Sequence, residues 1–131
     1  MNKTIFLDLD GVFANFEKRF KEIVGFEYKE NPTLAWSILD KEENLFLGLE
    51  PIDNAKNFFD VIYAKSIYEV KILTALPLLT NRLITSPSDK RNWVAKYLNP
   101  EIQVICSDGW RDKKNFCKSG DILVDDMLLI S

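Results

Sequence analysis

The sequence contains no histidine, and this absence excludes several kinds of active site. Hydrolases in which histidine activates a serine or a cysteine are excluded, and so are the usual zinc sites with histidine ligands. Any catalysis must therefore use carboxylates, lysines, hydroxyl groups or a hard cation.

Cysteine is also rare, and the chain has only Cys106 and Cys117. Two cysteines are too few for a disulfide scaffold, and their spacing does not form the CxxC motif of redox or zinc sites. We therefore expect Cys106 to pack in the core.

Long apolar segments are missing as well. No stretch approaches the roughly 18 to 20 residues that span a bilayer. Asp8 and Asp10 interrupt the apolar run near the N-terminus, which excludes a signal-peptide core. We expect a cytoplasmic protein without membrane contact.

The formal net charge is only −3, and basic and acidic residues are mixed along the chain. A protein that binds the nucleic acid backbone in bulk usually carries a basic surface, so we do not expect that function. With 131 residues, 47% of them hydrophobic, the chain is long enough for one domain with a buried core. No internal repeat or low-complexity tract divides residues 1–131.

Segments typical of strands and of helices alternate along most of this domain. Apolar, β-branched runs predict buried strands at 4–9, 70–73, 102–106 and 121–126. Apolar residues at helical spacing predict three helices between them. The first runs from the N-cap Asn15 to Gly25. The second begins at Asp53 or Asn54 and has the apolar residues Ala55, Phe58, Phe59, Ile62 and Tyr63. The third runs from the N-cap Ser88 to Leu98 and has Trp93, Val94 and Tyr97 on one face. This alternation indicates an α/β fold, a Rossmann-like parallel sheet with helices on both faces.

Residues 26–50 differ from the rest, because Pro32 interrupts any long helix and aromatic residues are scattered along the segment. We interpret this segment as an insertion outside the sheet.

Polar side chains follow the predicted strands. They are Asp8 and Asp10, then Thr74, then Ser107 and Asp108, and finally Asp125 and Asp126. The carboxyl ends of parallel strands meet at one edge, where ligands bind. Carboxylates gathered there would repel one another unless a cation lay among them, and Mg²⁺ prefers oxygen ligands. Thr74 and the Lys113-Lys114 pair could bind a phosphoryl group, and an aspartate can attack phosphorus.

The ordered segments DLDGV, ILTALP, a lysine and ILVDD resemble the four motifs of the haloacid dehalogenase-like (HAD-like) phosphohydrolases. The resemblance covers nearly the whole chain. Within that superfamily, FLDLDGVFANFE, LEPI, DKRNWVAKYL and GDILVDD are similar to segments of the 5'(3')-deoxyribonucleotidases of the cytosolic type C group.

The resemblance implies that Asp8 is the nucleophile and Asp10 the general acid and base. It also implies a magnesium site formed by Asp8, Asp10 and one of Asp125 or Asp126, with Asp10 contributing its main-chain carbonyl.

For the phosphoryl group, the resemblance implies Thr74 and the N–H groups around Ala75. Lys114 is the expected phosphate lysine, and Lys113 is the close alternative. Lys90 matches a second lysine near the substrate.

The expected nucleoside contacts come from aromatic residues. Phe16 matches a residue that helps to enclose the nucleoside in the nucleotidases. The 26–50 insertion takes the place of a small cap, so that Trp36 and Phe46 become candidate base contacts, although core or cap packing is the more common role of such residues.

The expected function is therefore a Mg²⁺-dependent phosphomonoesterase that hydrolyses (deoxy)ribonucleoside monophosphates through an aspartyl-phosphate. One alternative is a phosphatase for another small phosphate ester or a 3'-phosphate end. The other is a truncated, non-catalytic phospho-acceptor or binding module.

The sequence departs from the family pattern at its C-terminus. Members of the family usually continue with a further loop, helix and strand, whereas this sequence stops at Ser131, five residues after Asp126. We expect an exposed sheet edge, which makes a homodimer or impaired activity two possible consequences.

Overall fold

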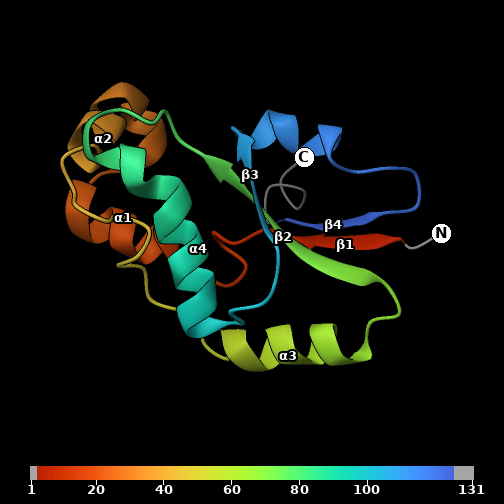
Figure 1. The fold of residues 1–131 in the computed structure, drawn as a ribbon. Helices are drawn as coiled ribbons and strands as arrows, with labels where there is room; N and C mark the ends of the chain where they lie inside the picture. Colours follow the sequence, from red (N-terminus) through yellow and green to blue (C-terminus); the bar gives the residue numbers. More distant parts are fainter. Residues whose placement is uncertain (1–2, 126–131) are drawn as a thin grey trace.

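A parallel sheet forms the centre of the computed structural model, which describes residues 3–125 (Figure 1). Within these residues the sheet has four strands in the order β3-β2-β1-β4. They are β1 (Thr4–Leu7), β2 (Glu69–Leu76), β3 (Val104–Asp108) and β4 (Ile122–Val124). All three pairings are parallel, which confirms the α/β sheet expected from the sequence.

The strand ends differ from the prediction by a few residues. β2 is longer than the predicted 70–73 because it pairs on both sides: residues 69–72 pair with β1 and residues 72–76 with β3. Thr74 therefore lies inside a strand, not after one. β3 begins two residues later than predicted, and Cys106 on this edge strand is half-buried instead of packing fully in the core.

The helices are α1 (Phe16–Val24), α2 (Pro32–Leu39), α3 (Ala55–Lys65) and α4 (Ser86–Tyr97), with short 3₁₀ helices η1 (Tyr28–Glu30), η2 (Asn81–Thr85) and η3 (Trp110–Asn115). α1 begins and ends as predicted. The Asn15 side chain accepts a hydrogen bond from the N–H of Lys18, and Gly25 takes the left-handed conformation that ends many helices.

The predicted start of α4 was wrong by three residues, because the N-cap is Thr85 and not Ser88. Ser88 is not an N-cap but lies in the first turn, where its hydroxyl donates to the carbonyl of Thr85 at 3.0 Å. The helix begins at Ser86, before Pro87. Proline is tolerated there because the N–H groups of a first turn have no partner within the helix.

Topology places α3 and α4 on one face of the sheet. The crossovers β1 to β2 and β2 to β3 run in the same direction, and right-handed crossovers put both connecting helices on the same side. The return from β3 to β4 runs the other way and carries η3. Figure 1 accordingly shows α3 below the sheet and η3 above it.

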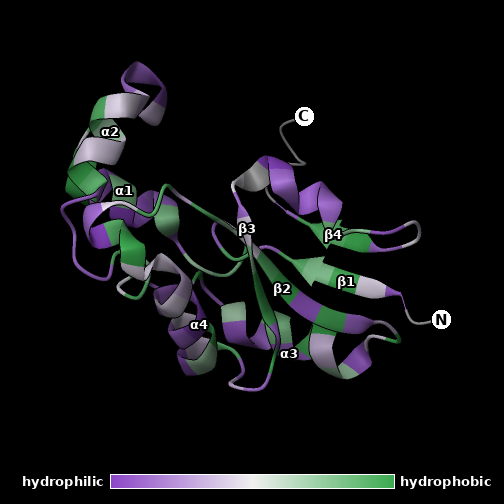
Figure 2. Ribbon diagram, turned by 45° about the horizontal axis from the view of Figure 1, so that its top comes forward, coloured by the Kyte–Doolittle hydropathy of each residue, from purple (hydrophilic) through white to green (hydrophobic). Residues whose placement is uncertain are grey.

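The face under α3 and α4 contains the main core. Figure 2 shows hydrophobic residues concentrated along the strands, whereas η3 is mostly hydrophilic. Fully buried members of this core include Leu7, Phe13, Phe59, Ile72 and Trp93. The predicted apolar face of α3 was only partly right, because Ala55 and Phe59 are buried but Phe58 and Tyr63 are about half exposed.

Residues 26–50 lie outside the sheet, as predicted, and contain η1 and α2. Pro32 is the first residue of α2, so it begins this helix and does not interrupt it. α2 packs beside α1, and both lie beyond the carboxyl end of the strands (Figure 1). We call residues 26–50 the cap segment.

Within residues 3–125, no helix is both long enough and apolar enough to cross a membrane.

The different burial of two adjacent phenylalanines predicts different effects on stability. Phe59 is fully buried and its ring lies 5.9 Å from that of Phe13, whereas Phe58 is 47% exposed. We expect Phe59→Ala to lower the free energy of unfolding by about 3–5 kcal/mol. Phe58→Ala should cost less than about 2 kcal/mol. Urea denaturation of both variants measures the difference, and equal losses would contradict the packing of α3.

Candidate active site

Asp8 stands at the carboxyl end of β1 and is held there by the backbone. Its N–H donates to the carbonyl of Val124 at 2.8 Å, which continues the pairing of β1 with β4 by one residue. The side chain is 7% exposed, and its Oδ1 accepts from the N–H of Leu9 at 2.8 Å. Gly11 then turns the chain away with a left-handed φ of 82°, a conformation that favours glycine.

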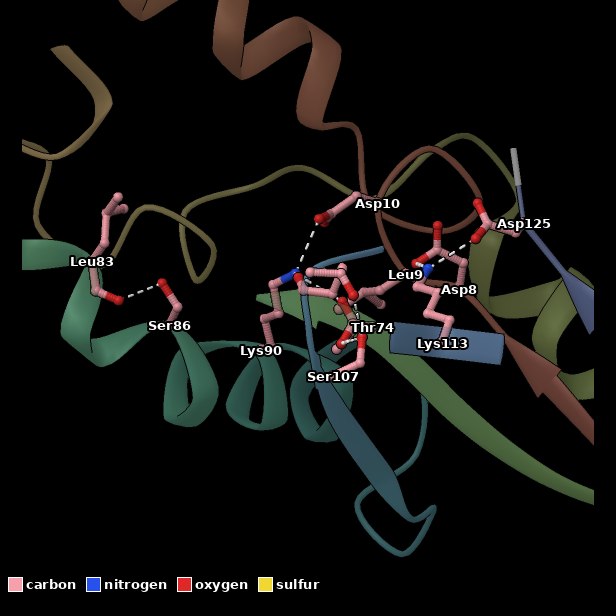
Figure 3. Close-up of polar contacts among 12 residues, drawn as sticks. Asp8, Leu9, Asp10, Thr74, Leu83, Ser86, Lys90, Ser107, Lys113 and Asp125 are labelled. Carbon is pink, nitrogen blue, oxygen red and sulfur yellow. Dashed lines mark hydrogen bonds and ion pairs between the residues drawn. The ribbon is translucent and has the colours of Figure 1, made fainter. Parts of the chain in front are cut away.

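Lys113 of η3 lies between two buried carboxylates. Its Nζ is 2.8 Å from Asp8 Oδ1 and 2.9 Å from Asp125 Oδ2, and its side chain is almost fully buried (Figure 3). Asp8 and Asp125 follow adjacent strands, so a single ammonium group neutralises charge at the ends of both β1 and β4. This arrangement is a buried, paired set of charges, not a surface salt bridge.

The environment of this pair shifts both ionisations. Burial raises the pKa of Asp8 to about 7, although the nearby Lys113 ammonium lowers it. For Lys113, burial lowers the pKa, but the carboxylates of Asp8 and Asp125 raise it more, so that its pKa lies above the usual value. Lys113 is therefore charged at neutral pH, and Asp8 is poised between its two forms.

Lys90 of α4 is the second buried cation of the site, and its side chain is fully buried. Its Nζ donates to Asp10 Oδ2 at 3.1 Å, to Thr74 Oγ1 at 2.7 Å and to the carbonyl of Ala75 at 2.6 Å (Figure 3). The ring centroid of Phe46, from the cap segment, lies 4.3 Å from the same atom.

We call the group of charged and polar residues at the carboxyl end of the strands the rim: Asp8, Asp10, Thr74, Lys90, Lys113 and Asp125. An open cavity of about 1490 Å³ connects the rim to the cap segment. Asp8, Asp10, Ala75 and Lys113 line one part of it. Residues of α1, of the cap segment and of the loop after β2 line most of the rest. The charged groups of the rim therefore face a space that is large enough for a small organic molecule.

Three aromatic rings stack along the cavity wall. The ring of Phe16 lies 5.9 Å from Phe46 at an interplanar angle of 17°, and 6.5 Å from Trp36 at 29°. All three line the cavity. The structure thus brings together the aromatic residues that the sequence suggested as nucleoside contacts.

The rim contains the kind of oxygen ligands that Mg²⁺ prefers, although no group of three acidic or cysteine side chains within residues 3–125 is close enough to form a metal cluster. Asp10 Oδ1 is buried and has no hydrogen-bond partner among the described residues. Three carboxylates (Asp8, Asp10, Asp125) and two ammonium groups (Lys90, Lys113) leave one formal negative charge. Both observations fit a bound cation. Asp126, the other predicted ligand, lies outside the described residues.

The structure brings most of the predicted site residues together. Of the two candidate phosphate lysines, Lys113 lies against Asp8, whereas Lys114, the choice made from the sequence, is exposed to solvent. Ala75 contributes its carbonyl to Lys90, in addition to lining the cavity. Sequence reasoning missed the contact between Lys90 and Phe46, because no local pattern links a helix lysine to an aromatic residue 44 positions away.

Comparisons with known proteins add no assignment: no family model matches the chain, and no curated protein matches its sequence.

The burial of Lys113 predicts a large effect of its removal on stability. Lys113→Met would leave two buried carboxylates without their shared cation, and we expect the free energy of unfolding to fall by about 3 kcal/mol. The matched control Lys114→Met removes an exposed lysine and should change it by no more than about 0.5 kcal/mol. Urea denaturation at neutral pH tests both variants, and similar losses would refute this assignment of Lys113.

Proposed function

We propose that this protein is a Mg²⁺-dependent phosphomonoesterase of the HAD-like type that hydrolyses (deoxy)ribonucleoside monophosphates. The observation that carries the proposal is the buried Asp8 carboxylate, which opens into a cavity beside Asp10, Thr74, two lysines and Asp125. These residues occupy the ordered positions on which the resemblance to the HAD-like phosphohydrolases rests.

Asp8 would be the nucleophile. Leu9 and Lys113 both bond to its Oδ1, which leaves Oδ2 for attack on phosphorus. In this step the Oδ2–P bond forms and the bond from phosphorus to the ester oxygen breaks. The leaving oxygen takes a proton from the carboxyl group of Asp10, and the product is an alcohol and an aspartyl-phosphate.

Water then completes the reaction. The Asp10 carboxylate removes a proton from the water, the water oxygen attacks phosphorus, and the bond to Asp8 breaks to release inorganic phosphate. Asp10 ends the cycle protonated, as it began. The Thr74 hydroxyl and Lys113 supply hydrogen bonds and positive charge for the phosphoryl oxygens.

Asp8, the main-chain carbonyl of Asp10 and one of Asp125 or Asp126 would hold Mg²⁺. When bound, the cation neutralises phosphate charge and favours the ionised form of Asp8. This second effect matters because burial holds the pKa of Asp8 at about 7 in the protein without metal.

The aromatic wall supports a substrate with a flat organic group. Phe16 and Trp36 are partly exposed at the cavity, and Phe46 packs against Phe16. Aromatic ring faces attract nucleobases without strict dependence on their identity. A nucleoside monophosphate has one phosphate for the rim and one base for this wall.

A panel of phosphate esters tests the proposal directly. It would contain ribo- and deoxyribonucleoside 5'- and 3'-monophosphates, sugar phosphates and an oligonucleotide with a 3'-phosphate, each with Mg²⁺ and with chelator. We expect Mg²⁺-dependent phosphate release by the wild type and a loss of about a thousandfold or more in Asp8→Asn. Asp60→Asn, the same change on an exposed part of α3, should keep full activity.

Other results would point elsewhere. Equal release by wild type and Asp8→Asn would remove Asp8 as the nucleophile. Release only from sugar phosphates or from 3'-phosphate ends would assign a different substrate. A stable phosphorylated protein after treatment with a small phosphodonor, without turnover, would indicate a phospho-acceptor module.

A further inference from the structure

Lys90 has the geometry of a residue that positions its neighbours. An ammonium group has three protons, and Lys90 donates to three oxygens: Asp10 Oδ2, Thr74 Oγ1 and the carbonyl of Ala75. The side chain is fully buried. A phosphate oxygen could therefore bind to Lys90 only if one of these three bonds broke.

The bond to Thr74 determines what the threonine hydroxyl can do. A hydroxyl group has one proton, and its oxygen here accepts from Lys90 at 2.7 Å. The proton must then point away from Lys90, where it can be donated to another acceptor. Lys90 thus fixes the orientation of the Thr74 hydroxyl, which is fully buried directly before Ala75 of the cavity wall.

The bond from Lys90 to Asp10 gives the two oxygens of that carboxylate different environments. Oδ2 is occupied by Lys90 at 3.1 Å, whereas Oδ1 is buried and has no hydrogen-bond partner within residues 3–125. Lys90 therefore holds Asp10 through one of its two carboxylate oxygens. The same lysine orients the residue that would act as acid and base and the residue that would bind phosphate.

Phe46 covers this lysine from the cap segment. Its ring centroid is 4.3 Å from Lys90 Nζ, and its side chain is 3% exposed. An ammonium group over an aromatic face is stabilised most when water is excluded, as it is here. The Phe46 ring also stacks on Phe16. Phe46 therefore connects the packing of the cap segment to the position of Lys90.

We propose that Lys90 and Phe46 form a positioning pair: Lys90 orients Asp10 and Thr74, and Phe46 holds Lys90 in place. The inference rests on the proposed phosphomonoesterase function. It assigns to Phe46 a role that does not depend on contact with a nucleobase. Packing of the cap segment therefore influences the reaction even for a substrate without an aromatic group.

The test compares Phe46→Leu with Phe20→Leu. Phe20 belongs to the same aromatic cluster, with its ring 6.1 Å from Phe16, and the substitution is identical. The substrate is glycerol phosphate, which has no ring, assayed with Mg²⁺. We expect Phe46→Leu to lower kcat by about ten- to a hundredfold with less than a threefold change in KM, because it misplaces the rim groups. Phe20→Leu should change neither, and Phe46→Tyr, which keeps a ring over Lys90, should restore kcat.

An NMR measurement reports on the pair without using activity. The Phe46 ring should shift the resonances of the Lys90 Cε methylene group, identified by their loss in Lys90→Arg. The shift should disappear in Phe46→Leu and persist in Phe20→Leu.

The two readouts separate the outcomes. An active wild type whose Phe46→Leu variant loses the NMR shift but keeps its kcat would overturn the positioning role alone. A rise in KM limited to nucleotides would also overturn it, because Phe46 would then be a base contact. A wild type that releases no phosphate from any ester in the panel would overturn the proposed function together with the pair.

Discussion

Two buried ammonium groups neutralise most of the negative charge that the sheet gathers at one edge. Parallel pairing of β1 with β4 forces Asp8 and Asp125 to follow neighbouring strands, and Asp10 lies two residues beyond Asp8. Carboxylates this close repel one another unless cations lie between them. Lys113 and Lys90 supply these cations from opposite faces of the sheet, Lys113 from η3 and Lys90 from α4. Each element thus places one ammonium group at the carboxyl end of the strands.

Burying these charged groups at the carboxyl end of the strands brings reactive side chains together but lowers the stability of the fold. Burial raises the pKa of Asp8 to about 7, which means that the fold disfavours the charged form that a nucleophile needs. Compensating stability comes from the apolar core between the sheet and its helices, where the indole N–H of Trp93 donates to the carbonyl of Leu49 at 2.8 Å. There the rings of Phe13 and Phe59 and the side chains of Leu7, Ile72 and Trp93 fill the space between the sheet and its helices. The site and the core are thus separate parts of one sheet.

The sequence was sufficient to predict the parallel sheet and the grouping of Asp8, Asp10 and Thr74, because strand periodicity and right-handed crossovers determine which ends meet. It was insufficient to choose between Lys113 and Lys114. These neighbours lie in a 3₁₀ helix, and only its rotation against the sheet decides which of them is buried. The exact strand ends were unpredictable for a related reason, since they depend on how far each partner strand extends.

The cap segment contacts the rim and α4 in several ways, and two of these contacts link its packing to the geometry of the site. At one place Phe46 covers Lys90. At the other, the carbonyl of Asp40 accepts from Asn81 Nδ2 at 3.0 Å, and Asp40 Oδ2 accepts from the hydroxyl of Thr80 at 3.2 Å. Thr80 and Asn81 belong to the connection between β2, which carries Thr74, and α4, which carries Lys90. The cap segment is therefore tied both to Lys90 and to the connection that leads from β2 to α4.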